Sequence, residues 1–373
     1  MNVLVAFGTR PEAIKLAPVI RELKRRPRIA LRVVTTAQHR QLLDQVLAVF
    51  SITPDADLGV MQPEQTLSEL SGRVLAAFDR SLHDDRPDLV LVQGDTTSAF
   101  MCALAAFYRQ VAVGHVEAGL RTESQFDPFP EEMNRRLTSA LSTLHFVPTE
   151  RAHRALVAEG VPERAIFKTG NTVVDAIQQI RATDAYRSVR AAVSAVADQR
   201  LILITLHRRE SWGEPLAGMC GAIREIVARH RDVRVVFPVH LNPWVHDLVS
   251  RELGTVERVQ LAEPFDYLTF VAHMEASTLI LTDSGGVQEE APTLGKPVLV
   301  LRNTTERPEA IEHGTARRVG TDPKTIVAAA AELLTDAAAY ATMARAVSPF
   351  GDGRAAIRIA DVIEARIAQQ AAV

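Results

Sequence analysis

Short, β-rich apolar runs alternate with helical patterns along most of this chain. The first series of runs is Val3–Phe7, Leu31–Thr35, Leu89–Gln93, Val111–His115 and Leu144–Val147. The second series is Leu201–Thr205, Val233–Phe237, Leu279–Thr282 and Val298–Leu301. Such alternation is typical of repeated βαβ units, in which helices cover both faces of a parallel sheet. The sequence therefore predicts an α/β protein with two doubly wound domains.

The length of the chain supports two domains, because 373 residues are too many for one ordinary core. A polar, alanine-rich helical segment at Thr183–Gln199 separates the two series of strands. We expect an N-terminal domain at residues 1–182 and a C-terminal domain at residues 183–353. A last helix at residues 354–373 is expected to pack back on the first domain.

Composition excludes several classes of function. The net charge of −3 and the pI near 6.4 leave no basic footprint for nucleic acid and no polybasic membrane anchor. The two cysteines, Cys102 and Cys220, support neither a disulfide framework nor a zinc site. No apolar run is long enough to span a bilayer, and no signal-peptide pattern opens the chain. A cytoplasmic protein is expected.

The stretch Leu279–Glu290 predicts a strand, a tight turn and a helix. Gly285 and Gly286 would let the backbone approach a ligand closely, and Ser284 stands at the expected helix start, where free N–H groups suit a phosphate. Glu290 lies about one turn into the helix and could accept hydrogen bonds from ribose hydroxyls. An ordinary βα turn is the alternative; a nucleotide diphosphate is the favoured ligand.

Polar residues also follow the strands of the first half. Arg10 and Lys15 come after the first strand, where they could meet phosphate or carboxylate, although Lys15 could also be a solvated helix residue. Asp95, Glu117 and Glu131 stand near later strand ends. Each acid alone is more often a helix cap or half of a surface ion pair, but three together indicate an acid and base site.

The strand-end loops of the second half carry His207, His240 and Arg307. A metal site is disfavoured, because no HExxH motif or close cluster of ligands accompanies the histidines. The turn after the first strand contains no GxGxxG motif, which argues against a nicotinamide or flavin site there. No cofactor is expected.

Six motifs follow one another in a defined order and spacing over nearly the whole chain. They are Gly8–Lys15, Gln93–Thr96, His115–Thr122, Pro130–Arg135, Thr282–Gly286 and Gly295–Pro297. Together they resemble the non-hydrolysing UDP-N-acetylglucosamine 2-epimerases. The resemblance implies a GT-B fold, which has two Rossmann-like domains with a cleft between them, and a homodimer.

The resemblance also implies a role for individual residues. Asp95, Glu117, Glu131 and His207 would be catalytic, and Asp95, Glu117 and His207 would also contact the substrate. The other residues implied to bind substrate are Arg10, Lys15, Phe265, Phe270, Ser284, Gly285, Gly286, Glu290 and Arg307. Among them, Phe270 would border the uracil, and Phe265 departs from the glutamine of some family members.

The implied reaction is reversible epimerisation at C2 of UDP-N-acetylglucosamine. Removal of the C2 proton and loss of UDP from C1 would give a 2-acetamidoglucal, to which UDP returns while a proton arrives on the opposite face. Four alternatives stay open. They are a hydrolysing epimerase, an epimerase of a related UDP-2-acetamido sugar, a GT-B glycosyltransferase and a non-catalytic sugar-nucleotide sensor.

The resemblance raises regulation as well, since many bacterial relatives are thought to bind a second UDP-N-acetylglucosamine. Gln38, His39 and Gln41 match that possible allosteric stretch. Glu64 stands where the regulated relatives have arginine, and its charge would repel a second diphosphate. We therefore expect weaker activation by UDP-N-acetylglucosamine than in those relatives.

Overall fold

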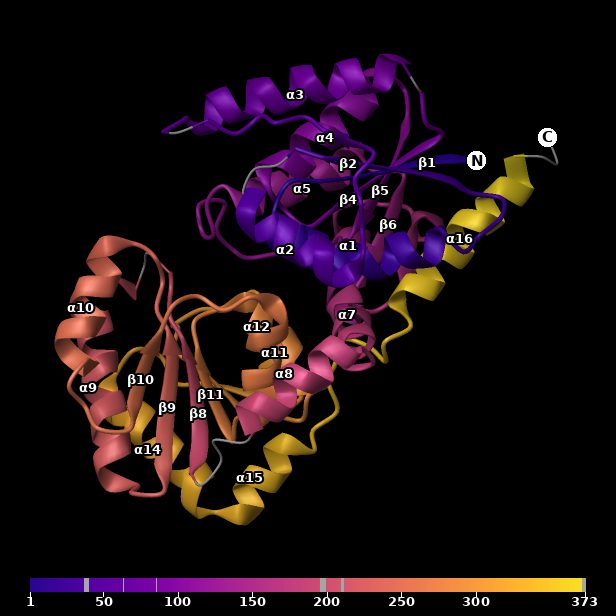
Figure 1. Ribbon diagram of the computed structural model, residues 1–373. Helices are drawn as coiled ribbons and strands as arrows, with labels where there is room; N and C mark the ends of the chain where they lie inside the picture. Colours follow the sequence, from indigo (N-terminus) through magenta and orange to yellow (C-terminus); the bar gives the residue numbers. More distant parts are fainter. Residues whose placement is uncertain (37–39, 63, 85, 195–198, 209–210, 371–373) are drawn as a thin grey trace. The chain divides into compact units, whose positions relative to one another are not determined.

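The structure, a computed structural model, describes the chain except residues 37–39, 63, 85, 195–198, 209–210 and 371–373 (Figure 1). The chain forms two compact units. Unit 1 contains Met1–Gln179 together with Phe350–Val373, and unit 2 contains Ile180–Pro349.

Unit 1 is built on a parallel sheet of seven strands in the order β3-β2-β1-β4-β5-β6-β7. Its strands are β1 (Asn2–Phe7), β2 (Ala30–Thr35), β3 (Ala56–Asp57), β4 (Leu89–Gln93), β5 (Ala112–Val116), β6 (Leu144–Val147) and β7 (Ile166–Lys168). Its helices are α1 (Arg10–Leu23), α2 (Arg40–Phe50), α3 (Leu67–Asp84), α4 (Thr97–Tyr108), α5 (Glu131–Leu141), α6 (Glu150–Ala158), a 3₁₀ turn at Glu163–Ala165, α7 (Thr172–Arg181, whose last two residues belong to unit 2) and α16 (Ala355–Gln370).

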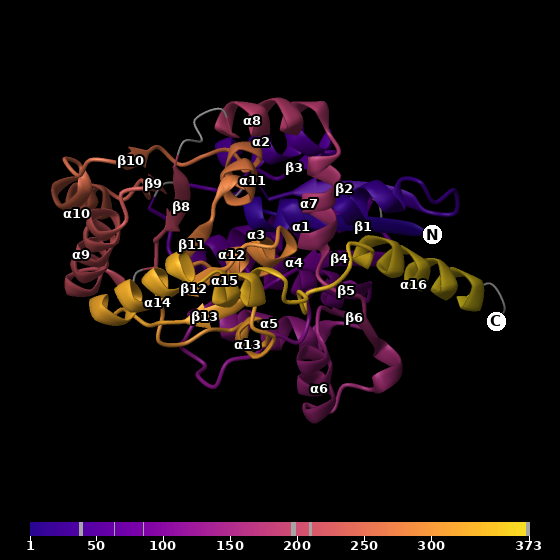
Figure 2. The ribbon, with the colours of Figure 1, turned by 90° about the horizontal axis from the view of Figure 1, so that it is seen from below.

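Helices cover the central strands of this sheet, which explains why those strands are continuous apolar runs. On one face, α3 and α4 pack apolar side chains such as Phe78 and Cys102 against β1, β4 and β5. Elsewhere in unit 1, α16 lies beside α1 (Figures 1 and 2). The Arg26 guanidinium joins these two segments through ion pairs of 2.7 Å to Glu364 and 2.9 Å to Asp361.

Unit 2 repeats the design with six parallel strands in the order β10-β9-β8-β11-β12-β13. Its strands are β8 (Arg200–Thr205), β9 (Val233–Pro238), β10 (Val259–Ala262), β11 (Leu279–Thr282), β12 (Val298–Val300) and β13 (Ala316–Arg318). Its helices are α8 (Asp184–Ser194), α9 (Glu214–Arg229), α10 (Pro243–Leu253), α11 (Tyr267–Ala276), α12 (Gly285–Thr293), α13 (Pro308–Glu312), α14 (Pro323–Thr335) and α15 (Ala337–Ala344). Alternate strand residues pack with α9, α10 and α14 into one core.

Strand register determines which loops share an edge in each sheet. In unit 1, Gln93 at the end of β4 pairs with Val116 at the end of β5, so Asp95 and Glu117 follow neighbouring strand ends. In unit 2, Thr205 of β8 pairs with Thr282 of β11. Because the carboxyl ends of parallel strands meet at one edge, each unit gathers its polar loops there.

No single helix of the described ranges is both long enough and apolar enough to cross a membrane. Within the same ranges, one pair of helices, α14 and α15, reaches that length and apolarity together, but the pair is bent by 95° at its break.

Candidate functional site

The first loop of unit 1 begins α1 with a buried carboxylate. Thr9 caps the helix and Glu12 completes a capping box, in which Glu12 Oε2 accepts hydrogen bonds from the backbone N–H of Gly8 (3.1 Å) and Thr9 (2.8 Å). The Thr96 hydroxyl donates to Oε1 at 2.9 Å. Burial raises the pKa of Glu12 to about 7, although these hydrogen bonds favour its charged form. Glu12 therefore ties the α1 loop to the loop after β4.

Lys15, one turn further along α1, is buried and forms an ion pair with Glu117. The same Glu117 oxygen, Oε2, accepts a hydrogen bond of 2.8 Å from Asn171 Nδ2. Lys15 is therefore not the solvated helix residue of the alternative interpretation. Arg10, the first residue of α1, is only half-buried.

The backbone of Glu117 is in the left-handed region, with φ of 66°. This conformation is uncommon for a residue with a side chain and often marks a functional site. Gly119 follows with φ of 87°, and a Cβ atom there would lie 2.4 Å from the carbonyl oxygen of Ala152. The turn after β5 is thus pressed against α6, which fixes where Glu117 leaves the sheet.

Asp95 is held by an arginine of α5. Arg135 donates to Asp95 Oδ2 from Nε (3.1 Å) and Nη2 (2.5 Å), and it also contacts Glu132 at 2.9 Å. Asp95 does not cap α4, since the cap is Thr96, whose hydroxyl accepts from the Ala99 N–H at 3.0 Å. The capping interpretation of Asp95 is therefore wrong, and its carboxylate remains about one quarter exposed.

Glu131 and Glu132 open α5 and have different environments. Glu131 is the first residue of the helix and is half-buried. The Glu132 carboxylate is fully buried and accepts from Arg135, from Arg136 at 2.7 Å and from the Thr122 N–H at 3.1 Å. Glu132 therefore anchors the helix that presents Glu131 and Arg135.

In unit 2, a buried aspartate organises the loop that carries His207. Asp283, directly after β11, accepts hydrogen bonds from the backbone N–H groups of His207 and Arg208 at 2.9–3.1 Å. His207 Nδ1 lies 3.1 Å from Asp283 Oδ1, while the His207 side chain stays 42% exposed. Its ring stacks on that of His240 at 6.5 Å. Asp283 therefore fixes the position of His207, while part of the His207 side chain stays exposed.

The strand, turn and helix predicted at Leu279–Glu290 are confirmed as β11 and α12, with Ser284 at the N-cap. None of the side chains that the structure describes caps this helix, and the first N–H groups of any α-helix lack partners within it. A Cβ atom at Gly285 would lie 2.7 Å from Arg307 Nη1, so glycine is needed where the guanidinium crosses the turn. The arrangement places a cation beside a helix N-terminus, which suits an anion.

Two buried acids hold Arg307 in that place. Its Nε donates to Glu289 at 2.9 Å, and Nη1 lies 3.5 Å from Glu306. Burial would raise the pKa of Glu306, but the charges of Arg307, Arg302 and Arg208 outweigh it and lower the pKa to about 2. Glu306 thus stays ionised at neutral pH and balances the cluster of arginines.

Three further predicted residues of unit 2 lie on α12, on α11 and in the loop before α11. Glu290 is buried and accepts a hydrogen bond of 3.1 Å from the Tyr267 hydroxyl. Phe265 stacks on His273 with ring centroids 4.4 Å apart. Phe270, in the first turn of α11, is half-buried.

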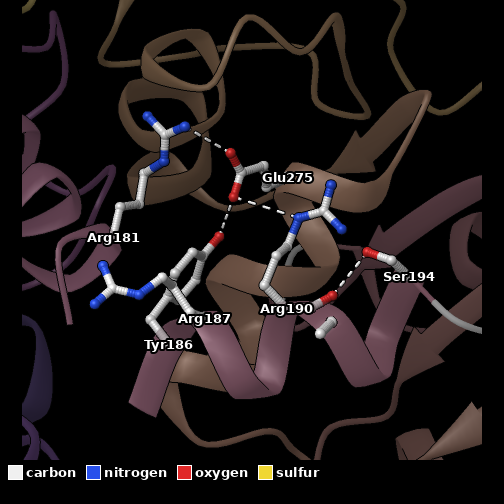
Figure 3. A pocket seen from close by; sticks show the side chains of 7 residues that line it. Arg181, Tyr186, Arg187, Arg190, Ser194 and Glu275 are labelled. Carbon is white, nitrogen blue, oxygen red and sulfur yellow. Dashed lines mark hydrogen bonds and ion pairs between the residues drawn. The ribbon is translucent and has the colours of Figure 1, made fainter. Parts of the chain in front are cut away.

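A cavity of about 410 Å³ on unit 2 lies between α8 and α11 and contains none of the predicted residues (Figure 3). Its centre is Glu275, which contacts Arg181 at 2.7 Å, Arg190 at 3.4 Å and the Tyr186 hydroxyl. Because Glu275 engages all three donors, this cluster fastens α8 and the end of α7 to α11.

The possible allosteric residues fall largely outside the description. Gln38 and His39 lie outside the described residues, and the side chain of Gln41 is not described. Four residues that hold the predicted site residues in place were not predicted from the sequence. They are Glu12, Glu132 and Asn171 in unit 1 and Asp283 in unit 2. Only Glu12 carried a readable signal, since a threonine three residues before a glutamate is the spacing of a capping box.

Comparison with known proteins gives one consistent family. The family model described as UDP-N-acetylglucosamine 2-epimerase matches residues 21–364. The chain is 51% identical to the UDP-N-acetylglucosamine 2-epimerase of Salmonella typhimurium over 370 residues, which cover 98% of both chains. It is also 51% identical to the Bacillus subtilis protein of that name over 361 residues, 97% of this chain and 94% of the relative.

A solved structure extends the likeness to the fold. The UDP-GlcNAc 2-epimerase of Neisseria meningitidis bound to UDP-GlcNAc matches with a TM-score of 0.93 at 46% identity, covering 97% of this chain and 99% of that one. The predicted α/β fold class of GT-B type is confirmed, with a doubly wound parallel sheet in each unit.

Proposed function

The chain belongs to the UDP-N-acetylglucosamine 2-epimerase family of isomerases, and we propose that it interconverts UDP-N-acetylglucosamine and UDP-N-acetylmannosamine without hydrolysing either. The observation that carries this proposal is the pair of carboxylates at neighbouring strand ends of unit 1. Glu117 is held by Lys15 and Asn171, and Asp95 is held by Arg135. Binding alone would need no such set of acids.

The reaction breaks two bonds of the sugar and forms them again. A carboxylate takes the C2 proton, the electron pair forms the C1–C2 double bond, and UDP leaves C1 with the electrons of the C–O bond. UDP then returns to C1 of the 2-acetamidoglucal while C2 receives a proton on the opposite face. Because the C2 proton is only weakly acidic, fixed carboxylates favour both transfers. We assign them to Asp95, Glu117 and Glu131, with His207 as a further catalytic group.

Unit 2 is proposed to hold the departing UDP. The N–H groups that follow Ser284 and the guanidinium of Arg307 form a ready site for diphosphate. Glu290 would accept hydrogen bonds from the ribose, Phe270 would border the uracil, and Phe265 would bind the uracil through its backbone groups. By the family resemblance, Arg10 and Lys15 are proposed to bind the diphosphate region. A firmly held UDP can return to C1, which favours epimerisation over release.

The relatives' names support a UDP-sugar substrate, since the Neisseria protein was solved with UDP-GlcNAc. A product assay separates the proposal from its rivals. Purified protein and UDP-N-acetylglucosamine should reach an equilibrium with UDP-N-acetylmannosamine, detected by anion-exchange chromatography and NMR. Accumulation of free N-acetylmannosamine and UDP would instead identify a hydrolysing enzyme. Sugar transfer to an added acceptor, without epimerisation, would identify a glycosyltransferase.

A further inference from the structure

We propose that Asn171 is a positioning residue that sets the orientation and charge of the Glu117 carboxylate, an inference that rests on the proposed function. Its Nδ2 donates to Glu117 Oε2 at 2.8 Å, the oxygen that also pairs with Lys15. The asparagine lies in the loop before α7, and Lys15 lies on α1. Two donors from two segments of the chain therefore converge on one carboxylate oxygen of Glu117. The backbone of Glu117 is itself in the left-handed region.

The Asn171 amide can adopt only one useful orientation. Its Oδ1 accepts a hydrogen bond of 3.0 Å from the backbone N–H of Val173, which requires the oxygen on that side. The Nδ2 group then points at Glu117. The side chain is buried, so neither contact is exchanged with bulk water. The hydrogen bond from Val173, at the start of α7, thus determines that Nδ2 is the atom that faces Glu117.

The backbone of Asn171 is fixed by the segment that brings the chain back into unit 1. The Asn171 N–H donates to the carbonyl oxygen of Phe350 at 2.6 Å, and the Phe350 side chain is fully buried. Gly170 and Gly351 permit this crossing, because a Cβ on Gly170 would lie 3.3 Å from the Gly351 Cα and from the Phe350 oxygen. Gly170 and Gly351, both with positive φ, therefore allow the two chain segments to pack closely beside Asn171.

The Asp175 carboxylate strengthens the same junction. It accepts hydrogen bonds from the backbone N–H groups of Ala355 (3.2 Å) and Ala356 (2.9 Å), at the start of α16. The segment from residue 169 to 175 is thus joined to the returning chain at several points. Such a braced loop is what a carboxylate needs if its position must be held within a fraction of an ångström.

A neutral donor suits this position for an electrostatic reason. An amide N–H stabilises the ionised carboxylate without adding a second positive charge to that of Lys15. Aspartate has nearly the same shape as asparagine but offers an acceptor and a negative charge. It would raise the pKa of Glu117 and turn its carboxylate away from that oxygen.

The test uses Asn171→Ala and Asn171→Asp in the full-length protein, with Asp322→Ala as a control for stability. Asp322 is the exposed N-cap residue of α14 in unit 2, where it accepts a hydrogen bond of 2.9 Å from the Thr325 N–H, so its loss lowers the melting temperature alone. Asn171→Ala should lower kcat about 10- to 100-fold with little change in KM. Asn171→Asp should also move the acidic limb of the kcat/KM profile upward by about one pH unit. Asp322→Ala should move neither quantity.

A double-mutant cycle with Glu117→Gln distinguishes positioning from general destabilisation. If Asn171 acts through Glu117, Asn171→Ala should change kcat less than twofold in the Glu117→Gln background. An equal fold loss in both backgrounds, or an unmoved pH profile in Asn171→Asp, would overturn the inference while the wild type remains an epimerase. A wild type without epimerase activity would overturn the proposed function, and this inference with it.

Discussion

His207 Nδ1 lies 3.1 Å from Oδ1 of Asp283, a carboxylate with no exposed surface that also accepts the backbone N–H of His207. One acid therefore fixes both the loop and the ring of the histidine. Burial would raise the pKa of Asp283, but the hydrogen bonds and charge of His207 outweigh it and leave the pKa below its usual range. An ionised Asp283 favours the His207 tautomer with the proton on Nδ1, which under the proposed function would leave Nε2 to act on the substrate.

Asp283→Asn should weaken this arrangement, because an amide can direct an N–H toward His207 instead of accepting from it. We expect kcat to fall about 10- to 100-fold and stability to fall by about 1–3 kcal/mol. Steady-state kinetics and urea unfolding measure the two effects. Asp322→Ala, which removes the exposed cap of α14, should cost stability alone. A folded Asp283→Asn enzyme with wild-type kcat would contradict the role given to Asp283.

The three proposed acids should each be needed for turnover. Asp95→Asn, Glu117→Gln and Glu131→Gln should each lower kcat by about 10²-fold or more while the protein stays folded. A residue that merely stabilised a helix end would cost about 1 kcal/mol and leave turnover nearly intact. Melting curves recorded beside the rates separate these outcomes, and full activity in any one variant would remove that residue from the mechanism.

Gly285→Ala should impair the binding of UDP. The new Cβ would lie 2.7 Å from Nη1 and 3.0 Å from Cζ of Arg307, and Glu289 and Glu306 prevent the guanidinium from moving freely. We expect Kd for UDP to rise about tenfold, the loss of one good contact of about 1.4 kcal/mol. Calorimetric titration measures it. Gly221→Ala, on α9 with only Arg224 at 4.0 Å, is the control that should bind normally.

Glu12 should make stability depend on pH. Its folded pKa of about 7 exceeds the ordinary value of 4.5, so the folded state binds a proton more tightly than the unfolded state. Its stabilising contribution is present below about pH 4.5 and is lost as the pH rises through about 7. Glu12→Gln should therefore lose less stability than wild type between pH 5 and pH 8, by at most about 3 kcal/mol.

Urea unfolding at the two pH values tests this difference. Glu69→Gln is the matched control, because Glu69 forms an exposed capping box with Thr66 whose hydrogen bonds lower its pKa. Glu69 titrates below the range from pH 5 to pH 8, so the Glu69→Gln variant should lose as much stability across this range as wild type. Equal losses in Glu12→Gln and wild type would refute the assignment of the raised pKa.

Much of the fold could be predicted from strand periodicity, and the omissions share one cause. The predicted runs correspond to the central strands of both sheets, whose burial on both faces makes them continuous apolar runs. The strands that were missed, β3, β7, β10 and β13, are the four sheet edges. An edge strand has one neighbour and partly exposed side chains, so Gln260 and Arg317 stand where an apolar run would be sought.

Only those site residues that come after strands in the sequence were predictable. Asp95, Glu117 and His207 come directly after strands, and their loops could be recognised in the sequence. The partner of Glu117 could not, because Lys15 is 102 residues away and meets it only in the folded sheet. Asn171 and Asp283 were missed for the same reason, since each acts through a tertiary contact that no local pattern reveals.

The central claim is that the C2–H bond is broken and remade without loss of the nucleotide. The most direct measurement is NMR of the reaction of UDP-N-acetylglucosamine in heavy water, with wild-type protein and with Glu117→Gln. Our account predicts that both UDP-sugars gain deuterium at C2 with wild-type protein and far more slowly with the variant. Conversion that leaves protium at C2, or the appearance of free sugar and UDP alone, would contradict it.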